Sequence, residues 1–363
     1  MPKIIHGADF HLDSAFGGLP PEKARQRRRE SRELLELLAE LVRTEGAEVV
    51  LLSGDLFDGE RVYPETLERL RSALGAMNCP VFIAPGNHDP YTPASPYAAG
   101  DWPENVHIFR SAEMEAVELP ELGCVVHGCA FAGGERTDQA LRGFVAPSDG
   151  KIHVMCIHGD VGAGDSTYGP ITREQIAESG LAYLALGHIH QYSGVNREGN
   201  TFWAYPGCPE GRGFDELGDK GVLAGEVSAA GADLHFVPLC RRRYRIIPVD
   251  VTGRELREAL AEALPESAAE DVCRFVLTGE SGEQGVDLPA LETAFAPKCY
   301  VLQLRDETRP AEDIWKRAGE DTLRGLFLQD LRQRYDAAAD DGERRKIAQA
   351  VRFGLAALDG RDR

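Results

Sequence analysis

Polar side chains that could bind metal ions follow five short apolar runs of this chain. The runs lie at residues 4–6, 49–52, 81–84, 154–157 and 181–186. Each is strand-sized and apolar on both faces, which is typical of strands buried inside a layered α/β domain. The polar residues that follow them are Asp9, His11, Asp55, Asp58, Asn87, His88, Asp89, His158, His188 and His190. Because the ends of neighbouring strands meet at one edge of a sheet, we expect these side chains to converge.

The types of donor atom indicate the chemistry. Carboxylate and amide oxygens mixed with imidazole nitrogens suit Mn, Fe or Zn and argue against a thiolate site or a calcium cage. A dinuclear centre needs a carboxylate that can bridge two ions, and Asp55 is the candidate bridge. Taken singly, each residue is better explained as an ordinary turn residue or a buried histidine. Their order along the chain, with glycine beside most of them, favours a crowded metal site instead.

The complete set resembles the motifs of the calcineurin-like metallophosphoesterase family, which are D-x-H, G-D-x-x-D, G-N-H-D, an isolated H, and G-H-x-H. This sequence matches each motif over about 185 residues, in the order Asp9-Phe10-His11, Gly54-Asp55-Leu56-Phe57-Asp58, Gly86-Asn87-His88-Asp89, His158 and Gly187-His188-Ile189-His190. Looser matches at 157–160, 205–213 and 218–221 resemble the bacterial SbcD/YhaO-like branch of DNA-repair exonucleases.

The resemblance implies a role for each residue. One ion would be bound by Asp9, His11, Asp55 and His190, and the other by Asp55, Asn87, His158 and His188. His88 would lie beside the scissile phosphate as the general acid, Asp89 would orient it, and Asp58 would assist from beside the ions. Relatives outside bacteria often carry histidine at the position of Asp58, so no role that requires a histidine there is carried over. Arg212 is a further candidate for contact with a phosphate.

The resemblance also implies a reaction, in which a hydroxide that bridges two divalent ions attacks a phosphodiester. Manganese is the first expectation for the ions, with iron or zinc as alternatives, and DNA is the expected substrate of an exonuclease or endonuclease in repair. Two other interpretations stay open. The same scaffold could act on small phosphodiesters, nucleotides or phosphoproteins, which the net charge of −19 favours. It could also be a non-catalytic scaffold subunit, although such proteins normally lose their ligands.

The pattern of elements predicts three parts. Residues 1–240 combine the apolar runs with helices expected at 21–44 and 64–77, and predict a two-sheet α/β sandwich flanked by helices. Residues 241–308 predict a small α+β module that resembles the capping domain of such nucleases. Residues 309–363 predict a helical tail. In the family, such a tail docks on an SMC-like ABC ATPase, and the candidate anchors are Leu323–Leu331 and Val351–Leu358. A homodimer is also common in the family.

Charge and cysteine content narrow the other possibilities. The basic cluster at 23–29 precedes several glutamates, so we expect a solvated helix face. The cluster at 241–245 is interpreted either as a nucleic-acid contact or as a charged strand edge. The eight cysteines lack C-x-x-C spacing, and no export leader or membrane span is recognised. We therefore expect reduced thiols in a cytoplasmic protein without a membrane partner.

Overall fold

The computed structural model describes residues 1–162, 165–281, 285–310 and 314–358. The chain divides into two compact units. The first comprises Met1–Ile247, Pro265–Arg274 and Ala294–Gln303, and the second comprises Pro248–Leu264, Phe275–Thr293 and Leu304–Arg363. Within the described part of the chain, no helix is both long enough and apolar enough to cross a membrane.

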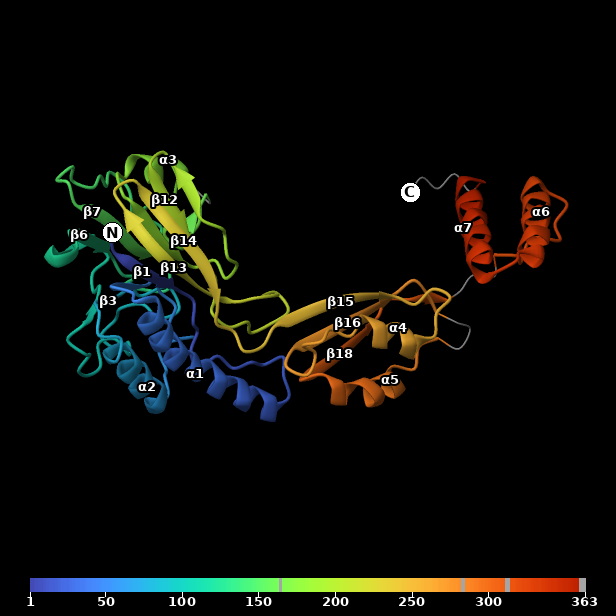
Figure 1. Cartoon of the computed structure of the whole chain (residues 1–363), viewed down its shortest axis with the longest axis horizontal. Coiled ribbons are helices and arrows are strands. Elements are labelled where there is room, and N and C mark those ends of the chain that lie inside the picture. The colour runs from blue at the N-terminus through green and yellow to red at the C-terminus, as the bar shows by residue number, and fades with distance from the viewer. Residues whose placement is uncertain (163–164, 282–284, 311–313, 359–363) are drawn as a thin grey trace. The chain divides into compact units, whose positions relative to one another are not determined.

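Two six-stranded sheets form the body of the first unit (Figure 1). The first sheet has the order β14-β13-β1-β2-β3-β4, with strands β14 (Gly231–Pro238), β13 (Gly221–Ser228), β1 (Lys3–Gly7), β2 (Val49–Leu52), β3 (Val81–Ile83) and β4 (Val106–Ile108). The second has the order β11-β12-β10-β7-β6-β5, with strands β11 (Asn196–Glu198), β12 (Thr201–Ala204), β10 (Tyr183–Gly187), β7 (Ile152–His158), β6 (Cys124–Gly128) and β5 (Glu115–Leu119). In both sheets the central strands are parallel to each other.

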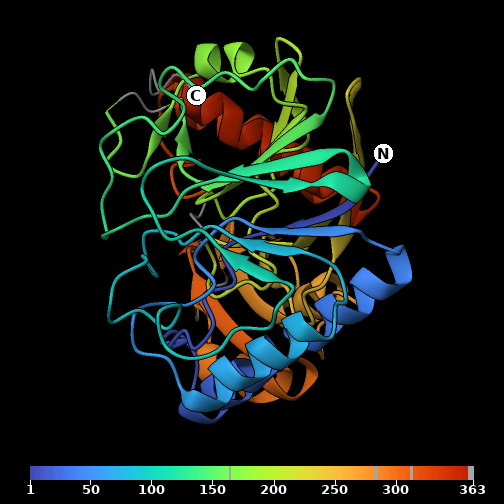
Figure 2. The same ribbon diagram turned by 90° about the vertical axis from the view of Figure 1, so that its left-hand side faces the viewer.

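The sheets pack face to face over an apolar core. Side chains from the first sheet, such as Leu51 and Phe82, join side chains from the second, such as Val154 and Ala185, in one buried cluster. The helices α1 (Pro21–Glu45) and α2 (Pro64–Gly75) cover the outer face of the first sheet, and the short helix α3 (Arg173–Glu178) lies against the second (Figure 2). The predicted two-sheet sandwich flanked by helices is therefore confirmed.

Smaller elements complete the structure. A three-stranded sheet has the order β15-β16-β18, with β15 (Tyr244–Asp250), β16 (Val272–Thr278) and β18 (Val301–Asp306). Helices α4 (Leu256–Ala263) and α5 (Leu288–Phe295) lie between these strands in the sequence. Two-residue strands form the pairs β8 (Asp160–Val161) with β9 (Pro170–Ile171) and β17 (Glu280–Ser281) with β19 (Arg309–Pro310). Single 3-10 turns occur at η1 (Pro120–Leu122) and η2 (Ala296–Lys298).

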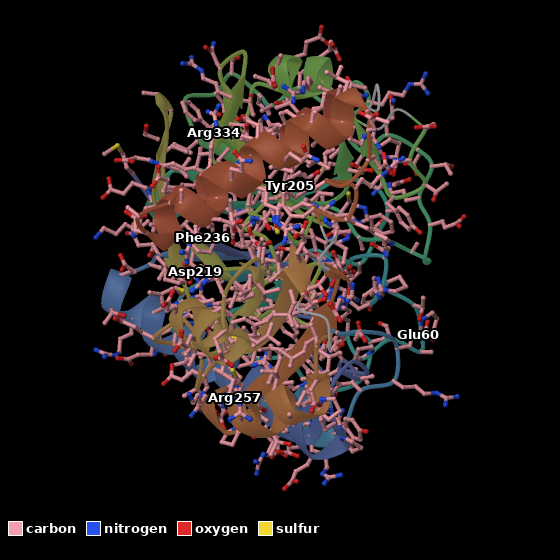
Figure 3. The ribbon with its side chains drawn as sticks, turned by 90° about the vertical axis from the view of Figure 1, so that its right-hand side faces the viewer. Glu60, Tyr205, Asp219, Phe236, Arg257 and Arg334 are labelled. Atoms are coloured by element: carbon pink, nitrogen blue, oxygen red, sulfur yellow. The ribbon has the colours of Figure 1, made fainter. Side chains whose placement is uncertain are left out.

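The C-terminal helices α6 (Leu323–Ala337) and α7 (Asp341–Leu358) pack on each other through Leu328 and Val351. The candidate anchor segment Leu323–Leu331 on α6 is only partly buried, since Leu323 and Leu326 are 72% and 58% exposed. Charged side chains cover much of the helix surfaces, including Arg257 on α4 and Arg334 on α6 (Figure 3).

Candidate metal centre

The strand ends of both sheets deliver the candidate metal ligands to one place. Strands β1, β2 and β3 of the first sheet are followed by the first three motifs, whereas β7 and β10 of the second sheet lead to the histidines. Donor atoms within 4.8 Å of one another form three overlapping groups, which are Asp9 with His11 and His190, Asp9 with Asp55 and His158, and His11 with Asp58 and His88. Because the groups share residues, they make one continuous cluster.

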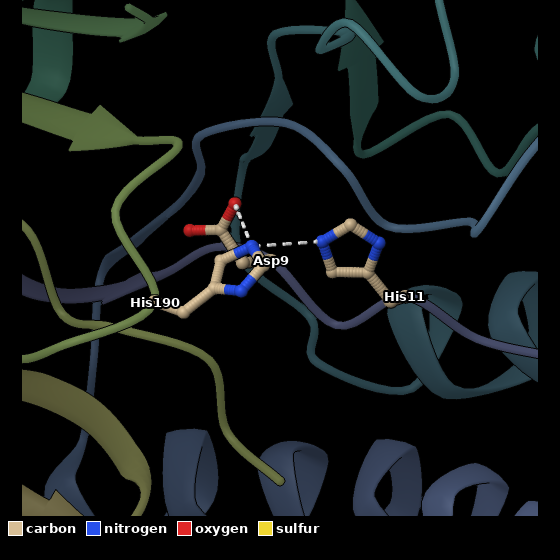
Figure 4. A group of neighbouring side chains, drawn as sticks. All are labelled: Asp9, His11 and His190. Atoms are coloured by element: carbon tan, nitrogen blue, oxygen red, sulfur yellow. Dashed lines mark hydrogen bonds and ion pairs between the residues drawn. The ribbon is translucent and has the colours of Figure 1, made fainter. Parts of the chain in front are cut away.

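The distances in the cluster leave room for ions between the side chains. The Nε2 atoms of His11 and His190 face each other at 3.2 Å, beside the Asp9 carboxylate (Figure 4). Asp55 Oδ2 lies 3.7 Å from His11 Nε2 and 3.5 Å from His158 Nε2. The Asp55 carboxylate thus lies between two histidines that the sequence analysis assigned to different ions.

The remaining two expected ligands lie on the His158 side of the cluster. Asn87 Oδ1 is 2.9 Å from His158 Nε2. The His188 ring meets the His158 ring edge-on, with centroids 5.3 Å apart. All seven residues expected to bind metal are therefore brought together.

Three histidines are held so that Nε2 faces the centre. The Nδ1 atom of His11 donates to Asp58 at 3.0 Å, that of His158 donates to the Ser53 carbonyl at 2.9 Å, and that of His190 donates to a carboxylate at 2.7 Å. Each bond places the proton on Nδ1, so that Nε2 offers its lone pair. Metal-binding histidines are fixed in this way by acceptors behind them. The donor set therefore fits divalent metal ions.

Burial gives the centre its affinity for positive charge. Asp9 is fully buried, and burial followed by repulsion from Asp55 raises the pKa of Asp9 well above its usual range. Two carboxylates this close cannot both ionise cheaply without a cation between them. A divalent ion would supply that compensating charge.

Backbone geometry shows how tightly the centre is built. Four of the expected ligands, Asp9, His11, Asp55 and His188, have φ values of 55°, 44°, 52° and 115°. Non-glycine residues rarely adopt these values, which cost about 1–3 kcal/mol each and cluster at functional sites. A Cβ atom added at Gly187 would lie 1.8 Å from the Ser53 carbonyl oxygen, so only glycine fits between the two sheets there.

The other predicted residues lie around the cluster in distinct positions. His88 is exposed at its edge, and its ring lies edge-on to that of His11 with centroids 4.8 Å apart. Arg212 donates from Nη1 to Asp58 at 3.2 Å, which places its positive charge beside the centre.

Asp89 differs from the expectation that it orients His88. In the part of the chain that the structure describes, its carboxylate has no bond to the His88 side chain. It is fully buried and accepts hydrogen bonds from the main-chain N–H groups of Asp55, Phe57 and Gly86 and from the hydroxyl of Tyr97. Asp89 therefore fixes the loops after β2 and β3 to each other.

Glu216 and Tyr168 were not singled out from the sequence. Glu216 is the carboxylate that accepts from His190 Nδ1, and it also accepts from the main-chain N–H of Arg212 at 2.6 Å. The Tyr168 ring lies over that of His188, with centroids 5.0 Å apart. Both residues lie in loops without a repeating pattern, and the only signal for Glu216 was its position four residues after Arg212.

The arginines at 241–245 are neutralised by acidic partners. Arg242 is buried and pairs with Glu30 at 2.7 Å. The nearby Arg243 and Arg245 each lie 2.5 Å from an aspartate, and Arg241 lies 3.5 Å from a glutamate. Of the two interpretations that the sequence left open, these contacts favour a charged strand edge.

Comparison with known proteins identifies the family. Residues 2–192 match the calcineurin-like phosphoesterase family, and the chain belongs to it. The chain is 30% identical over 313 residues to the uncharacterized metallophosphoesterase YhaO of Bacillus subtilis strain 168, which covers 79% of this chain and 74% of that one.

Two further relatives have names that refer to DNA repair or to a nuclease. The DNA double-strand break repair protein Mre11 of Aeropyrum pernix is 27% identical over 291 residues, 72% of this chain and 69% of its own. The SbcD component of the nuclease SbcCD of Bacillus subtilis strain 168 is 25% identical over 258 residues, 60% and 63% respectively. The predicted family is confirmed, and these relatives support its DNA-repair nuclease-like branch. Membership in this family implies metal-dependent hydrolysis of phosphoesters.

Proposed function

We propose that this protein is a phosphodiesterase with two metal ions that cleaves DNA, as an exonuclease or endonuclease in repair. The observation that carries the proposal is the set of histidines whose Nδ1 atoms are held from behind while their Nε2 atoms face two buried carboxylates. DNA as substrate is supported by the relatives named for DNA repair and for a nuclease. Manganese is the metal we would test first, because the donors mix oxygen with imidazole.

The ligands divide between two ions around Asp55. In this proposal one ion is held by Asp9, His11, Asp55 and His190. The other is held by Asp55, Asn87, His158 and His188. When bound, such ions lower the pKa of a water molecule and stabilise negative charge on a phosphoryl group.

The residues around the ligands have separate tasks. Asp58 orients His11 through Nδ1, and a second carboxylate does the same for His190. His88, exposed at the edge of the cluster, donates a proton to the leaving alkoxide. Arg212 directs its positive charge toward the phosphate, and Asp89 keeps the two ligand loops in register.

The proposal also assigns a role to each of the three predicted parts of the chain and a protein partner to the last of them. Residues 1–240 would form the catalytic domain, residues 241–308 the capping module and residues 309–363 the helical segment. The exposed apolar residues Leu323, Leu326 and Phe353 on α6 and α7 would dock on an SMC-like ABC ATPase. We expect such an ATPase to bind the full chain. Deletion of residues 310–363 should abolish this binding. Binding that survives the deletion would exclude this docking site.

The test compares wild type with His88→Asn on two substrates, end-labelled linear DNA and bis(p-nitrophenyl) phosphate, each with Mn²⁺. We expect wild type to cleave both. In the variant, activity should fall at least about a hundredfold while bound metal is unchanged, because only the proton donor is removed. His235→Asn, on an exposed strand position of β14, is the matched control.

The other outcomes separate the alternatives. Activity on the small diester alone would favour a phosphoesterase for small phosphodiesters or nucleotides, the candidate that the net charge of −19 favours. Loss of neither activity in His88→Asn would reject the role of His88. No activity on either substrate with metal bound would favour a non-catalytic scaffold.

A further inference from the structure

A positively charged cleft lies along the first half of α1. Its volume is about 450 Å³, and it is lined by Glu22, Arg25, Gln26, Arg28, Arg29, Arg32 and Glu65. Four arginines against two glutamates make this a locally basic surface on a chain of net charge −19. We refer to it as the α1 arginine cleft.

The helical period places these arginines in a row. Residues 25, 28, 29 and 32 follow the three- and four-residue spacing that aligns side chains on one face of a helix. At 1.5 Å per residue, the row from Arg25 to Arg32 extends about 10 Å. Arg27 is on the opposite side, where it is buried and bonded to Glu210 and to the Gly211 carbonyl. A row of this length suits an extended polyanion better than a single small anion.

Two of the cleft arginines are available to a ligand. Arg25 and Arg29 are exposed, and neither has a hydrogen bond or ion pair to any residue that the structure describes. Arg28 uses one nitrogen on the Ala15 carbonyl at 3.0 Å. Arg32 is held by Asp13 and Glu65 at 2.9 and 3.1 Å, which fixes the wall of the cleft. The cluster at 241–245 differs, because acids already neutralise it.

An exposed aromatic residue adjoins the cleft. Tyr63 is 56% exposed, and the Arg32 guanidinium lies 5.5 Å from the centre of its ring. Its main-chain N–H donates to Asp13, the same residue that holds Arg32. An exposed ring next to a basic groove is the combination with which proteins bind unpaired bases and their backbone.

Two short chain segments connect residues beside the cleft to residues of the proposed catalytic centre. The loop that contains Asp13 and Ala15 starts at His11, and the segment that reaches Tyr63 starts at Asp58. Both His11 and Asp58 belong to the donor cluster. Because four residues span at most about 14 Å, the loop whose Ala15 carbonyl accepts from Arg28 begins close to the centre at His11, within the reach of a DNA strand held in the cleft.

We propose that the α1 arginine cleft binds the phosphate backbone of the DNA strand beyond the phosphate that is cleaved, with Arg25 and Arg29 as the contacts and Tyr63 as a stacking surface for a base. This inference rests on the proposed function. On a single strand, each phosphate contact contributes about 0.7 to the slope of log K against log salt. Removing two contacts should therefore lower the slope by about 1.4 and weaken binding about 25-fold at 0.1 M salt.

The experiment measures the fluorescence anisotropy of a labelled 30-nucleotide DNA with Mn²⁺-loaded protein, in a His88→Asn background to limit cleavage. The test variant is Arg25→Gln/Arg29→Gln. The matched control is Arg43→Gln/Arg69→Gln, which removes the same charge from one exposed and one half-buried position outside the cleft. We expect the weakened binding and reduced slope only in the test variant. Arg25→Lys/Arg29→Lys should restore most of the affinity, because phosphate contact needs charge, and this rescue separates charge loss from misfolding.

A second assay distinguishes failure of the cleft inference from failure of the proposed function. It measures hydrolysis of bis(p-nitrophenyl) phosphate by the test and control double variants, each with His88 intact. We expect this activity to be unchanged in the test variant, because the cleft lies outside the donor cluster. If wild type cleaves DNA and the test and control pairs bind DNA equally, the cleft inference is overturned and the proposed nuclease stands. If wild type hydrolyses the small diester but neither binds nor cleaves DNA, the nuclease proposal fails and the cleft inference fails with it.

Discussion

Replacing Glu216 with glutamine tests how the centre holds His190. The Glu216 carboxylate accepts from His190 Nδ1 at 2.7 Å and from Arg212 Nη2 at 2.8 Å. Although burial opposes its ionisation, the hydrogen bonds from His190 and Arg212 hold the pKa of Glu216 well below its usual range. Glutamine keeps the shape of the side chain but removes the charge, so His190 Nδ1 would donate to a neutral amide oxygen, which holds its tautomer more weakly.

The magnitude follows from the bond that is weakened. A hydrogen bond to a charged group is worth about 1.5–3 kcal/mol. A bond to a neutral acceptor is worth about 0.5–1.5 kcal/mol, so the exchange costs about 1–1.5 kcal/mol. Each 1.4 kcal/mol corresponds to a factor of about ten, so the metal ion at His190 should bind about 5- to 12-fold more weakly. This is near the lower end of the effect of changing the partner behind a metal-binding histidine.

Calorimetric titration with Mn²⁺ and the Mn²⁺ dependence of bis(p-nitrophenyl) phosphate hydrolysis measure this effect. We expect one of two sites to weaken, with much of the rate recovered at saturating metal. Glu121→Gln, which makes the same change at an exposed position, should alter neither titration. Unchanged metal affinity in Glu216→Gln would refute the reasoning that this carboxylate maintains the ligand.

Three other changes probe the bridge, the packing and a buried histidine pair. Asp55→Ala should release metal from both positions, because its carboxylate lies between His11 and His158; metal analysis of the dialysed protein measures the stoichiometry. Gly187→Ala should lower the free energy of unfolding in metal-free urea titrations by about 1–3 kcal/mol, since the new methyl group overlaps the Ser53 carbonyl. Burial, then the neighbouring His153, lowers the pKa of buried His127 from 6.5 to about 4. As the pH falls, His127 is therefore protonated in the unfolded chain before it is protonated in the folded one. The free energy of unfolding should fall by up to roughly 3 kcal/mol between pH 6.5 and pH 4.

Each expectation has an outcome that contradicts it. Two metal ions retained by Asp55→Ala would reject the bridge. Equal stability of Gly187→Ala and Gly133→Ala would show that the close approach is relaxed at no cost, because a Cβ atom at Gly133 meets nothing within 4 Å. In His127→Gln the acid-dependent loss of stability should shrink, and an unchanged pH profile would assign the loss to other groups.

Much of the fold and of the donor cluster could be predicted because the strands leave a simple signal. Runs such as 49–52 and 81–84 are apolar throughout, and the structure places them at β2 and β3 in the centre of a sheet. The helices expected at 21–44 and 64–77 occur at Pro21–Glu45 and Pro64–Gly75. These features depend on local sequence and on burial, and the positions of apolar residues along the chain indicate both.

The features that could not be predicted are contacts of charged side chains with groups elsewhere in the fold. The run Arg241–Arg245 has the composition of a nucleic-acid contact, but Arg242 is buried against Glu30, more than two hundred residues earlier in the chain. Asp89 looks like a neighbour of His88, yet its carboxylate accepts from main-chain N–H groups of Gly86 in its own loop and of Phe57 in the loop after β2. Pairings over such separations are set by tertiary packing and leave no local pattern.

The position of β1 within its sheet bears on how the protein is made. Lys3 on this strand pairs with Glu226 on β13, more than two hundred residues later, so one side of β1 stays without its partner until β13 has been synthesised. Contacts between such distant residues slow folding, because a long loop must close before they can form. The metal centre depends on the same late event, since it joins Asp9 to His188 and His190. Because the complete set of ligands is assembled only in the folded domain, we expect added metal to slow unfolding and to leave the early collapse of the refolding chain unchanged.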